Sequence, residues 1–188
     1  MSTLIVIAGP SGTGKGTIVR RLLERVPMLR VSVSATTRAP RPGEEDGRDY
    51  WFISPRQFQQ RYDDGDFLEA FEVYGARYGT PRAAVEAQLA EGNDVVAEVD
   101  VQGALAIRDA FPEALLVFVQ PPSREVQRRR LHDRDPDADP DALEARLAQA
   151  EAEEALSDRF DAVVVNDDLD RAVDEILQML EARRGEAI

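Results

Sequence analysis

The sequence lacks cysteine altogether and has a single histidine among its 188 residues. Without cysteine the chain has no disulfide, no thiolate ligand for a metal and no cysteine nucleophile, a composition typical of cytoplasmic proteins. The one histidine, His132, lies among arginines, with no second histidine to complete a zinc site or a proton relay. We therefore expect a cytoplasmic protein whose chemistry uses neither residue type.

Long hydrophobic runs are also missing, so no segment approaches the roughly 20 apolar residues of a membrane-spanning helix. The first apolar run, Leu4–Ala8, leads straight into a glycine-rich loop, which is not typical of a secretory signal. The formal net charge of −13 argues against nucleic acid or an anionic membrane as partner, because both require a basic surface. A small anionic substrate stays compatible, since it needs only a local group of arginines.

Lysine is nearly absent: Lys15 is the one lysine, and the remaining 22 of the 23 Lys and Arg residues are arginines. A phosphate-binding loop explains this exception, because a compact ammonium can reach β- and γ-phosphates over curled backbone where a wide guanidinium fits poorly. An apolar strand precedes the loop and an amphipathic helix follows it, as such a site requires. The predicted ATP-binding loop is Gly9, Pro10, Ser11, Gly12, Thr13, Gly14, Lys15, Gly16 and Thr17.

This loop departs from the G-x-x-x-x-G-K-[ST] pattern at one position. Gly16 stands where a hydroxyl would ligate magnesium, and the hydroxyl comes one residue later, at Thr17. We therefore predict no metal ligand from the protein and expect Mg(2+) to be carried in with ATP, held by phosphates and waters. The loop leaves the phosphate acceptor open, because nucleotide kinases, GTPases and motor ATPases all share it.

The remaining pattern predicts an α/β fold. Short runs that are apolar throughout, rather than alternating, indicate parallel strands covered on both faces. Helical apolar stripes separate them, one ended by Pro27, one by Gly92 and the last capped by Asp167 or Asp168. The expected strands are Leu4–Ala8, Val95–Val99, Leu115–Val119 and Ala162–Val165, with Leu29–Val33 as a weaker fifth.

Two segments interrupt this alternation. Residues 35–80 are rich in aromatics, glycine and charge, and the alternating run Phe67–Val73 suits a small mixed or antiparallel sheet. Residues 123–158 are polar and predict a charged helical hairpin, whose second helix is capped by Asp139 and begins at Pro140. With little apolar content, this hairpin is a poor piece of core and suits a mobile lid.

Several short motifs then follow one another along the chain. In Ser34–Glu44, two arginines three residues apart stand in a proline-stiffened loop and can fork onto one terminal phosphate. With the motifs that follow, the sequence resembles the guanylate kinase family of P-loop nucleoside monophosphate kinases over almost the whole chain. The further motifs are Asp46–Tyr50, Phe67–Glu69, Tyr78–Pro81, Glu98–Gly103 and Val165–Leu169.

The resemblance implies a single domain with a five-stranded parallel core (1–34, 81–122 and 159–188), a GMP-binding insertion (35–80) and a helical lid (123–158). It implies ATP and GMP as substrates and adds Asn166 to the ATP-binding residues. The GMP phosphate would be held by Arg38, Arg41, Tyr50 and Tyr78. Guanine and ribose would be surrounded by Ser34, Glu69, Thr80 and Asp100. The catalytic residues would be Lys15, Arg38, Arg134 and Arg146.

A physical argument supports the role of Glu69. The pairing edge of guanine presents two adjacent donors, which one carboxylate can accept, while Ser34 or Thr80 donates to the carbonyl oxygen. Adenine would leave that carboxylate unpaired, at a cost of about 1–3 kcal/mol. Simpler explanations compete: Glu69 as an exposed strand residue, Asp100 as a helix cap, and the two tyrosines (Tyr50 and Tyr78) as a cover over a small core.

The sequence departs from the family pattern in the lid and at Glu98. The family usually has Arg-Gly at the first lid arginine, whereas Arg134 precedes Asp135 and Pro136. The family usually has aspartate where this chain has Glu98, which changes reach more than chemistry.

Transfer of the γ-phosphoryl group of ATP to GMP, within purine nucleotide metabolism, is the predicted function. Two rival functions differ from it in class. A guanylate-kinase-like interaction module would bind protein ligands without catalysis, and an intact loop with Lys15 argues against it. A sugar-phosphate kinase would keep the loop but would have no use for Glu69 as a reader of guanine.

Overall fold

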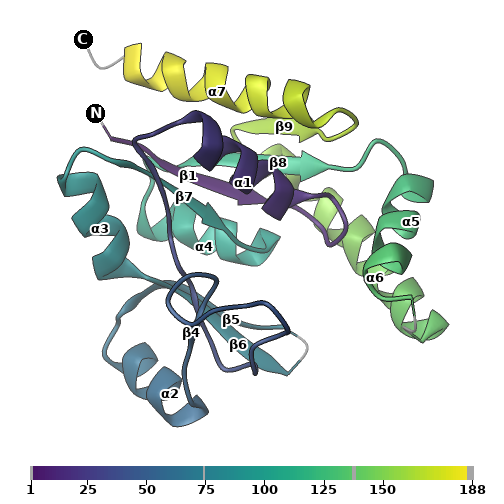
Figure 1. Ribbon diagram of the computed structural model, residues 1–188, viewed down its shortest axis with the longest axis horizontal. Helices are drawn as coiled ribbons and strands as arrows, with labels where there is room; N and C mark the ends of the chain where they lie inside the picture. Colours follow the sequence, from purple (N-terminus) through teal and green to yellow (C-terminus); the bar gives the residue numbers. More distant parts are fainter. Residues whose placement is uncertain (1, 74, 137–138, 186–188) are drawn as a thin grey trace.

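The computed structural model describes residues 2–73, 75–136 and 139–185, and its centre is a parallel sheet of five strands (Figure 1). The strand order is β2-β7-β1-β8-β9, and every neighbouring pair is parallel. The predicted α/β class with a five-stranded parallel core is therefore confirmed. The strands are β1 (Leu4–Ala8), β2 (Leu29–Val31), β7 (Asp94–Glu98), β8 (Leu115–Gln120) and β9 (Ala162–Val165).

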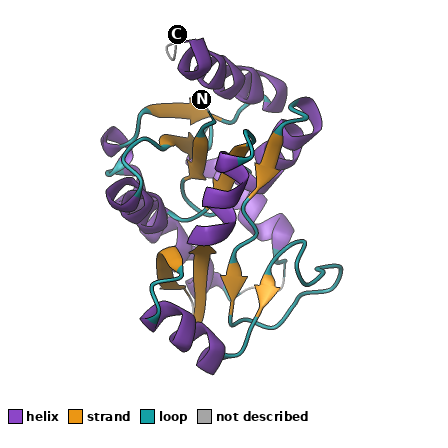
Figure 2. Cartoon of the chain, turned by 90° about the vertical axis from the view of Figure 1, so that its left-hand side faces the viewer, coloured by secondary structure: helices purple, strands orange, loops and turns teal. Residues whose placement is uncertain are grey.

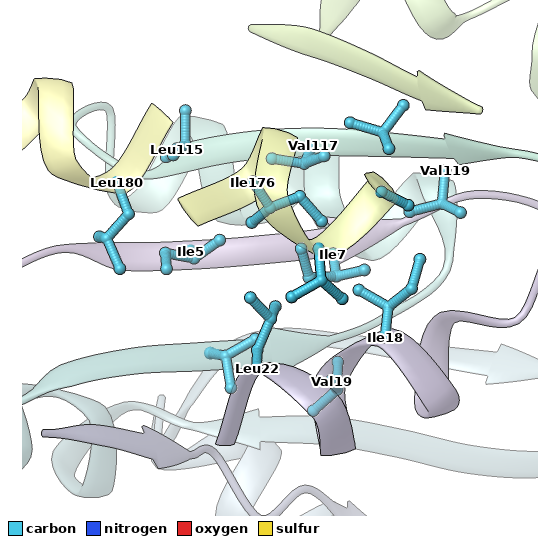
Figure 3. Close-up of a cluster of buried hydrophobic side chains, with 14 of the residues drawn as sticks. Ile5, Ile7, Ile18, Val19, Leu22, Leu115, Val117, Val119, Ile176 and Leu180 are labelled. Atoms are coloured by element: carbon cyan, nitrogen blue, oxygen red, sulfur yellow. The ribbon is translucent and has the colours of Figure 1, made fainter. Parts of the chain in front are cut away.

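Helices cover both faces of this sheet (Figure 1). On one face α1 (Lys15–Arg25) and α7 (Leu169–Gly185) pack against alternate strand residues, with Ile7 among the fully buried ones. Figure 3 shows this cluster, in which Leu22 and Ile176 point from the two helices toward the strands. On the other face lie α3 (Arg82–Ala90) and α4 (Val101–Ala110). Burial on both faces explains why these strands are apolar throughout.

Three predicted strands have other bounds than expected: β8 ends one residue later, at Gln120, β7 is shifted one residue earlier at both ends, and β2 is shorter. Strand β7 begins one residue earlier, at Asp94, because this buried carboxylate accepts a hydrogen bond from the Thr3 N–H at 2.8 Å and pairs with Arg184. Strand β2 ends at Val31, two residues early, because the chain leaves the sheet after the Ser32 N–H has bonded to Val96. The polar residue Asp94 within β7 and the early end of β2 both depend on contacts with residues distant in the sequence. The local hydrophobic pattern contains no information about those contacts.

The predicted helix boundaries agree better with the structure. Helix α1 ends at Arg25, two residues before Pro27, and Gly92 follows α3 with a φ of +89°. Of the two candidate caps for α7, Asp168 accepts a hydrogen bond from the Arg171 N–H at 2.9 Å. These boundaries follow from local chemistry, which is why the sequence predicts them.

A smaller sheet with the order β4-β3-β6-β5 forms the lower part of the molecule in Figure 2. The pairs β3–β6 and β5–β6 are antiparallel and β3–β4 is parallel, so the sheet is mixed, as predicted. Helix α2 (Pro55–Asp63) packs on it through Phe58, whose ring stacks on Phe67 at 4.7 Å. The strands are β3 (Ala35–Thr36), β4 (Trp51–Phe52), β5 (Phe67–Val73) and β6 (Ala76–Pro81).

The predicted helical hairpin is present as α5 (Arg124–Arg134) and α6 (Pro140–Glu154), with Asp139 capping α6. Asp137 and Ala138, which lie between these helices, are outside the described residues. The expectation that the hairpin contributes little to the core needs correction for α5. Gln127 is fully buried and donates to the Ser11 carbonyl oxygen at 2.8 Å, and Leu131 is 2% exposed. One helix of the hairpin is thus anchored on the glycine loop.

The close packing of the glycine loop against β8 can be tested at Gly9, the first loop residue. Its φ is +136°, and a Cβ there would lie 2.3 Å from the backbone oxygen of Val119 on β8. We expect Gly9→Ala to lower the free energy of unfolding by about 2–5 kcal/mol, because overpacking adds to left-handed strain. Urea unfolding measures the loss. The matched control is Gly92→Ala, at φ +89° with open space around it, which should lose only about 1–2 kcal/mol. Equal losses in the two variants would contradict the predicted clash.

Candidate active site

One large cleft, of about 1310 Å³, opens at the carboxyl ends of β1 and β7. Ligands of parallel α/β sheets bind at such a position, where the strand order reverses. The cleft is bounded by the glycine loop, the small sheet and the α5–α6 hairpin. The predicted site residues that line it are Gly9, Ser11, Gly12, Gly14, Lys15, Gly16, Thr17, Ser34, Arg38, Arg41, Tyr50, Glu69, Tyr78, Asp100, Arg134, Arg146 and Asn166.

Three predicted residues, Pro10, Thr13 and Thr80, do not line the cleft. Thr13 is fully buried, and its hydroxyl donates to the Pro10 carbonyl oxygen at 3.0 Å, so it shapes the loop from behind. Thr80 is also fully buried and donates to Glu69. Thr13 and Thr80 support cleft residues instead of facing the cavity.

Lys15 begins α1 at the bottom of the cleft. Its Nζ donates to the carbonyl oxygens of Gly9 at 2.6 Å and Pro10 at 2.9 Å. Burial lowers the pKa of Lys15 from its usual value, while the carboxylates of Glu98, Glu153 and Asp100 act in the opposite direction. The ammonium is thus curled over the loop, beside acidic groups, where the phosphates of a nucleotide would supply stronger partners.

Asn166 and Arg130 hold the glycine loop in place from the β9 side. The Asn166 Nδ2 donates to the Thr13 oxygen at 2.7 Å, and Arg130 donates to the oxygens of both Thr13 (3.3 Å) and Asn166 (3.0 Å). Arg130 lines the cleft and was missed by the sequence reasoning. The available signal was the i, i+3, i+4, i+7 spacing of Gln127, Arg130, Leu131 and Arg134, which marks one face of α5.

Across the cleft, the small sheet brings Arg38, Tyr50 and Tyr78 together. Arg38 Nε donates to the Tyr78 hydroxyl at 3.3 Å, and its guanidinium carbon lies 5.2 Å from the centre of the Tyr50 ring. The two tyrosine rings meet edge to face at 5.9 Å. Arg41 is exposed but also lines the cleft. This is a cationic, hydroxyl-bearing corner suited to a terminal phosphate.

Glu44 also lies in this corner. From the sequence it was known only as the last residue of the motif Ser34–Glu44, and no role was predicted for it. Its carboxylate makes a bidentate ion pair with Arg38, at 2.7 and 2.9 Å. The pair and a further hydrogen bond from the Arg41 N–H lower the pKa of Glu44 to about 2. Glu44 is therefore ionised at neutral pH.

Glu69 lies on β5 with 7% of its surface exposed, so the competing explanation of an exposed strand residue is wrong. The Thr80 hydroxyl donates to Glu69 Oε1 at 2.6 Å. Burial raises the pKa of Glu69 to about 7, against the lowering effect of that hydrogen bond. A buried carboxylate with one oxygen supported by a hydroxyl is ready to accept donors from a ligand in the cleft.

Asp100 accepts a hydrogen bond from the Gly103 N–H at 2.7 Å and caps α4, so the helix-cap explanation is confirmed, although the side chain also lines the cleft. A Cβ at Gly103 would lie 3.2 Å from Asp100 Oδ1 and 3.4 Å from Glu69 Oε2. The missing side chain therefore keeps open the space between the two carboxylates. Ser34, just before β3, also lines the cleft.

The α5–α6 hairpin brings further charged residues to the cleft. Arg134, the last residue of α5, is exposed there, and Arg146 lines the cleft from α6. Glu153, also on α6, faces Lys15, and burial raises its pKa while the Lys15 charge lowers it. The sequence reasoning missed Glu153, because an isolated glutamate in an acidic helix carries no distinguishing signal.

Within the described residues, no group of three or more His, Asp or Glu residues could hold a metal ion by itself. A Cβ at Gly16 would lie 3.3 Å from Glu98 Oε2, so the absent side chain leaves this carboxylate room beside the loop. One carboxylate next to the expected phosphates suits a magnesium ion whose other ligands are phosphates and waters.

A glycine loop suited to the phosphates of one nucleotide faces, across a single cleft, arginines and a buried carboxylate suited to a second. This arrangement on a parallel α/β sheet is that of a P-loop nucleotide kinase. The family model for guanylate kinase matches residues 1–183, and the chain belongs to this family.

Individual proteins agree with the family model. The chain is 53% identical over 180 residues to the guanylate kinase of Gloeobacter violaceus, covering 96% of this chain and 87% of that protein. It is 49% identical over 177 residues to the guanylate kinase of Rubrobacter xylanophilus, covering 94% and 92%. The crystal structure of guanylate kinase from Anaplasma phagocytophilum matches with a TM-score of 0.81 at 32% identity, covering 97% of this chain and 86% of that one.

A more distant likeness concerns the fold alone. Shikimate kinase from Bacteroides thetaiotaomicron matches with a TM-score of 0.53 at 16% identity, covering 95% of this chain and 98% of that one.

Proposed function

We infer that the protein is a guanylate kinase, which reversibly transfers the γ-phosphoryl group of ATP to GMP and gives ADP and GDP. One observation carries this inference: a single cleft is lined by Lys15 on one side and by Arg38 and Glu69 on the other. The two rival functions fit less well. An interaction module has no need of a buried carboxylate beside a phosphate loop, and a sugar-phosphate kinase has no need of Glu69.

On the donor side, the glycine loop and the first turn of α1 would bind the phosphates of ATP through backbone N–H groups and the helix dipole. Lys15 would turn from the loop carbonyls toward the β- and γ-phosphates. Asn166 and Arg130, which hold the loop from one side, would border the nucleoside.

On the acceptor side, Arg38, Arg41, Tyr50 and Tyr78 would bind the phosphate of GMP. Glu69 would accept the two adjacent guanine donors, and Ser34 would donate to the guanine oxygen. Thr80, whose hydroxyl is already donated to Glu69, would act by holding that carboxylate in place. Asp100 would face the ribose.

The transition state of such a transfer is loose and spreads its charge over oxygens, so catalysis needs positioning and charge stabilisation rather than a strong base. The accepting atom is already a phosphate oxygen. Arg134 and Arg146 would approach the transferring group as the hairpin (123–158) closes over the core and the insertion (35–80). Closure would also exclude water, which could otherwise take the phosphoryl group.

Magnesium, when bound with ATP, would neutralise charge on the β- and γ-phosphates. It would enter with the nucleotide, and the Glu98 carboxylate, next to Gly16, would orient its water ligands.

Within the described ranges, no helix is both long and apolar enough to cross a membrane. We separately propose a cytoplasmic enzyme of purine nucleotide metabolism that binds neither membranes nor nucleic acid, because the composition lacks cysteine and the net charge is −13.

The decisive experiment measures ADP formation from ATP with a panel of acceptors: GMP, AMP, CMP, UMP and several sugar phosphates. We expect GMP to be preferred over AMP by at least about 10–100-fold in kcat/KM, since adenine leaves Glu69 unpaired. ADP formation with a sugar phosphate alone would support that rival. Absence of turnover with every acceptor, in protein that is folded and binds GMP, would support the interaction module.

A further inference from the structure

The guanidinium of Arg38 has two hydrogen-bonding edges, and the ion pair with Glu44 occupies one of them. The end edge, made of Nη1 and Nη2, is bonded to the two Glu44 oxygens at 2.7 and 2.9 Å, and Nη1 also donates to the Ala39 oxygen at 2.8 Å. The side edge consists of Nε and the second hydrogen of Nη2. Among the described residues, the Tyr78 hydroxyl accepts from this edge, 3.3 Å from Nε, which is long for a hydrogen bond between a charged donor and an oxygen.

Glu44 also shapes the backbone that carries the second arginine. The Arg41 N–H donates to Glu44 Oε2 at 2.7 Å, and the Glu44 N–H donates back to the Arg41 oxygen at 3.1 Å. The turn between them contains Gly43, at φ +87°. One carboxylate thus orients the guanidinium of Arg38 and closes the loop from which Arg41 projects.

Burial indicates that this arrangement is built into the fold. The side chains of Arg38 and Glu44 are only 15% and 19% exposed, whereas the neighbouring pair Arg48–Glu45 is 58% and 66% exposed. The Arg38 guanidinium also lies over the rings of Tyr50 and Phe52, at 5.2 and 5.7 Å. With its end edge occupied and its plane packed on aromatic rings, Arg38 can offer a ligand only the side edge next to Tyr78.

We propose that Glu44 is a positioning residue, which aims the side edge of Arg38 and the loop of Arg41 at the phosphate of the acceptor nucleotide. The proposal rests on the proposed function, because it takes Arg38 as a ligand of the GMP phosphate. A phosphate oxygen bound at the side edge meets Nε, Nη2 and the Tyr78 hydroxyl at once. A flexible arginine would have to find this geometry during binding and would lose rotamer freedom in doing so.

The test compares Glu44→Gln with Glu45→Gln, the same change at the adjacent exposed glutamate. We expect Glu44→Gln to raise KM for GMP about 5–30-fold, although it removes a negative charge near the phosphate, while KM for ATP changes by less than about twofold. Glu45→Gln should leave both constants within about twofold. Glu44→Asp, which keeps the charge but shortens the reach, should recover part of the loss. Unchanged or tighter GMP binding in Glu44→Gln would overturn the proposal.

Guanosine, which lacks the phosphate, separates positioning from general damage to the insertion. Its affinity, measured by competition against GMP, should be the same in the wild type and Glu44→Gln, because Glu44 acts only on the phosphate corner. An equal loss for guanosine and GMP would overturn the proposal and assign Glu44 a purely structural role. A wild type that does not turn over GMP would instead refute the proposed function, so the two failures are distinguishable.

Discussion

Replacing Lys15 with alanine is expected to lower the rate of phosphoryl transfer at least ~100-fold, because one preorganised charge contact to the transferring phosphates is lost. The Nζ lies above the loop, 2.6 Å from the Gly9 oxygen, and the chain has no other lysine. Neighbouring arginines cannot substitute, since Arg130 is already bonded to the loop backbone and its planar group is too wide for the loop interior. The measurement is single-turnover transfer from ATP to GMP.

The matched control is Arg21→Ala, which removes a partly exposed cation from the same helix. Arg21 faces Asp170 on α7 rather than the cleft, so turnover should stay within about twofold. Lys15→Ala also leaves two loop carbonyls without their partner, and thermal unfolding of both variants confirms that the assay temperature lies below the transition. Unchanged turnover in folded Lys15→Ala would exclude the role given to this lysine.

Replacing Glu69 with glutamine is expected to raise KM for GMP about 10–100-fold and to reduce the preference for GMP over AMP. The glutamine keeps the size of the side chain and can still accept from Thr80, but it replaces one acceptor oxygen by a donor that opposes a guanine N–H. KM for ATP should change little. The control is Glu72→Gln, on the exposed side of the same strand. A collapse of ATP binding in Glu69→Gln would show that the residue belongs to the donor side.

The pH dependence provides a second signature of Glu69. Because its pKa is about 7, the carboxylate that accepts the guanine donors becomes protonated as the pH falls below 7. GMP affinity of the wild type should therefore fall with acidification, approaching tenfold per pH unit well below that value. GMP itself also titrates in this range, but Glu69→Gln retains that contribution and should show a flatter profile. Identical profiles would contradict the assignment.

The same pKa has a consequence for stability. A carboxyl group whose pKa is raised in the folded state binds protons more tightly there than in the unfolded chain. Stability is then greatest at low pH with respect to this group and is lost as the pH rises through about 7. At pH 8, Glu69→Gln should accordingly be more stable than the wild type, by no more than about 3 kcal/mol, and the gain should vanish near pH 4, below the pKa of 4.5 of an unperturbed glutamate. Denaturant unfolding at both pH values measures the difference.

The sequence was most informative where local chemistry decides the structure. Asp139 and Asp168 cap the starts of helices, and Gly92 follows the end of one. Each acts through contacts within a few residues, and the structure agrees with each prediction. The glycine loop was predictable for the same reason, since strand, loop, lysine and helix are contiguous. The acceptor residues were named by family resemblance, because their motifs are spread over many tens of residues and no local rule joins them.

The sequence was least informative about supporting contacts. Arg130 reaches the loop only because α5 packs on Ser11 through Gln127, and nothing within α5 indicates that neighbour. The fully buried position of Thr80 follows from the pairing of β5 with β6, so its support of Glu69 could not be separated beforehand from direct contact with guanine.

By itself, then, the sequence determined the α/β class, the phosphate loop and the helix ends, because each depends on hydrophobic period or on hydrogen bonds between near neighbours. Only the tertiary structure decided which charges face one another. Glu44 holds Arg38 although six positions separate them, and Glu69 is buried against a strand that runs back beside its own. Both effects act through space: desolvation raises the pKa of Glu69, and the ion pair with Arg38 lowers the pKa of Glu44.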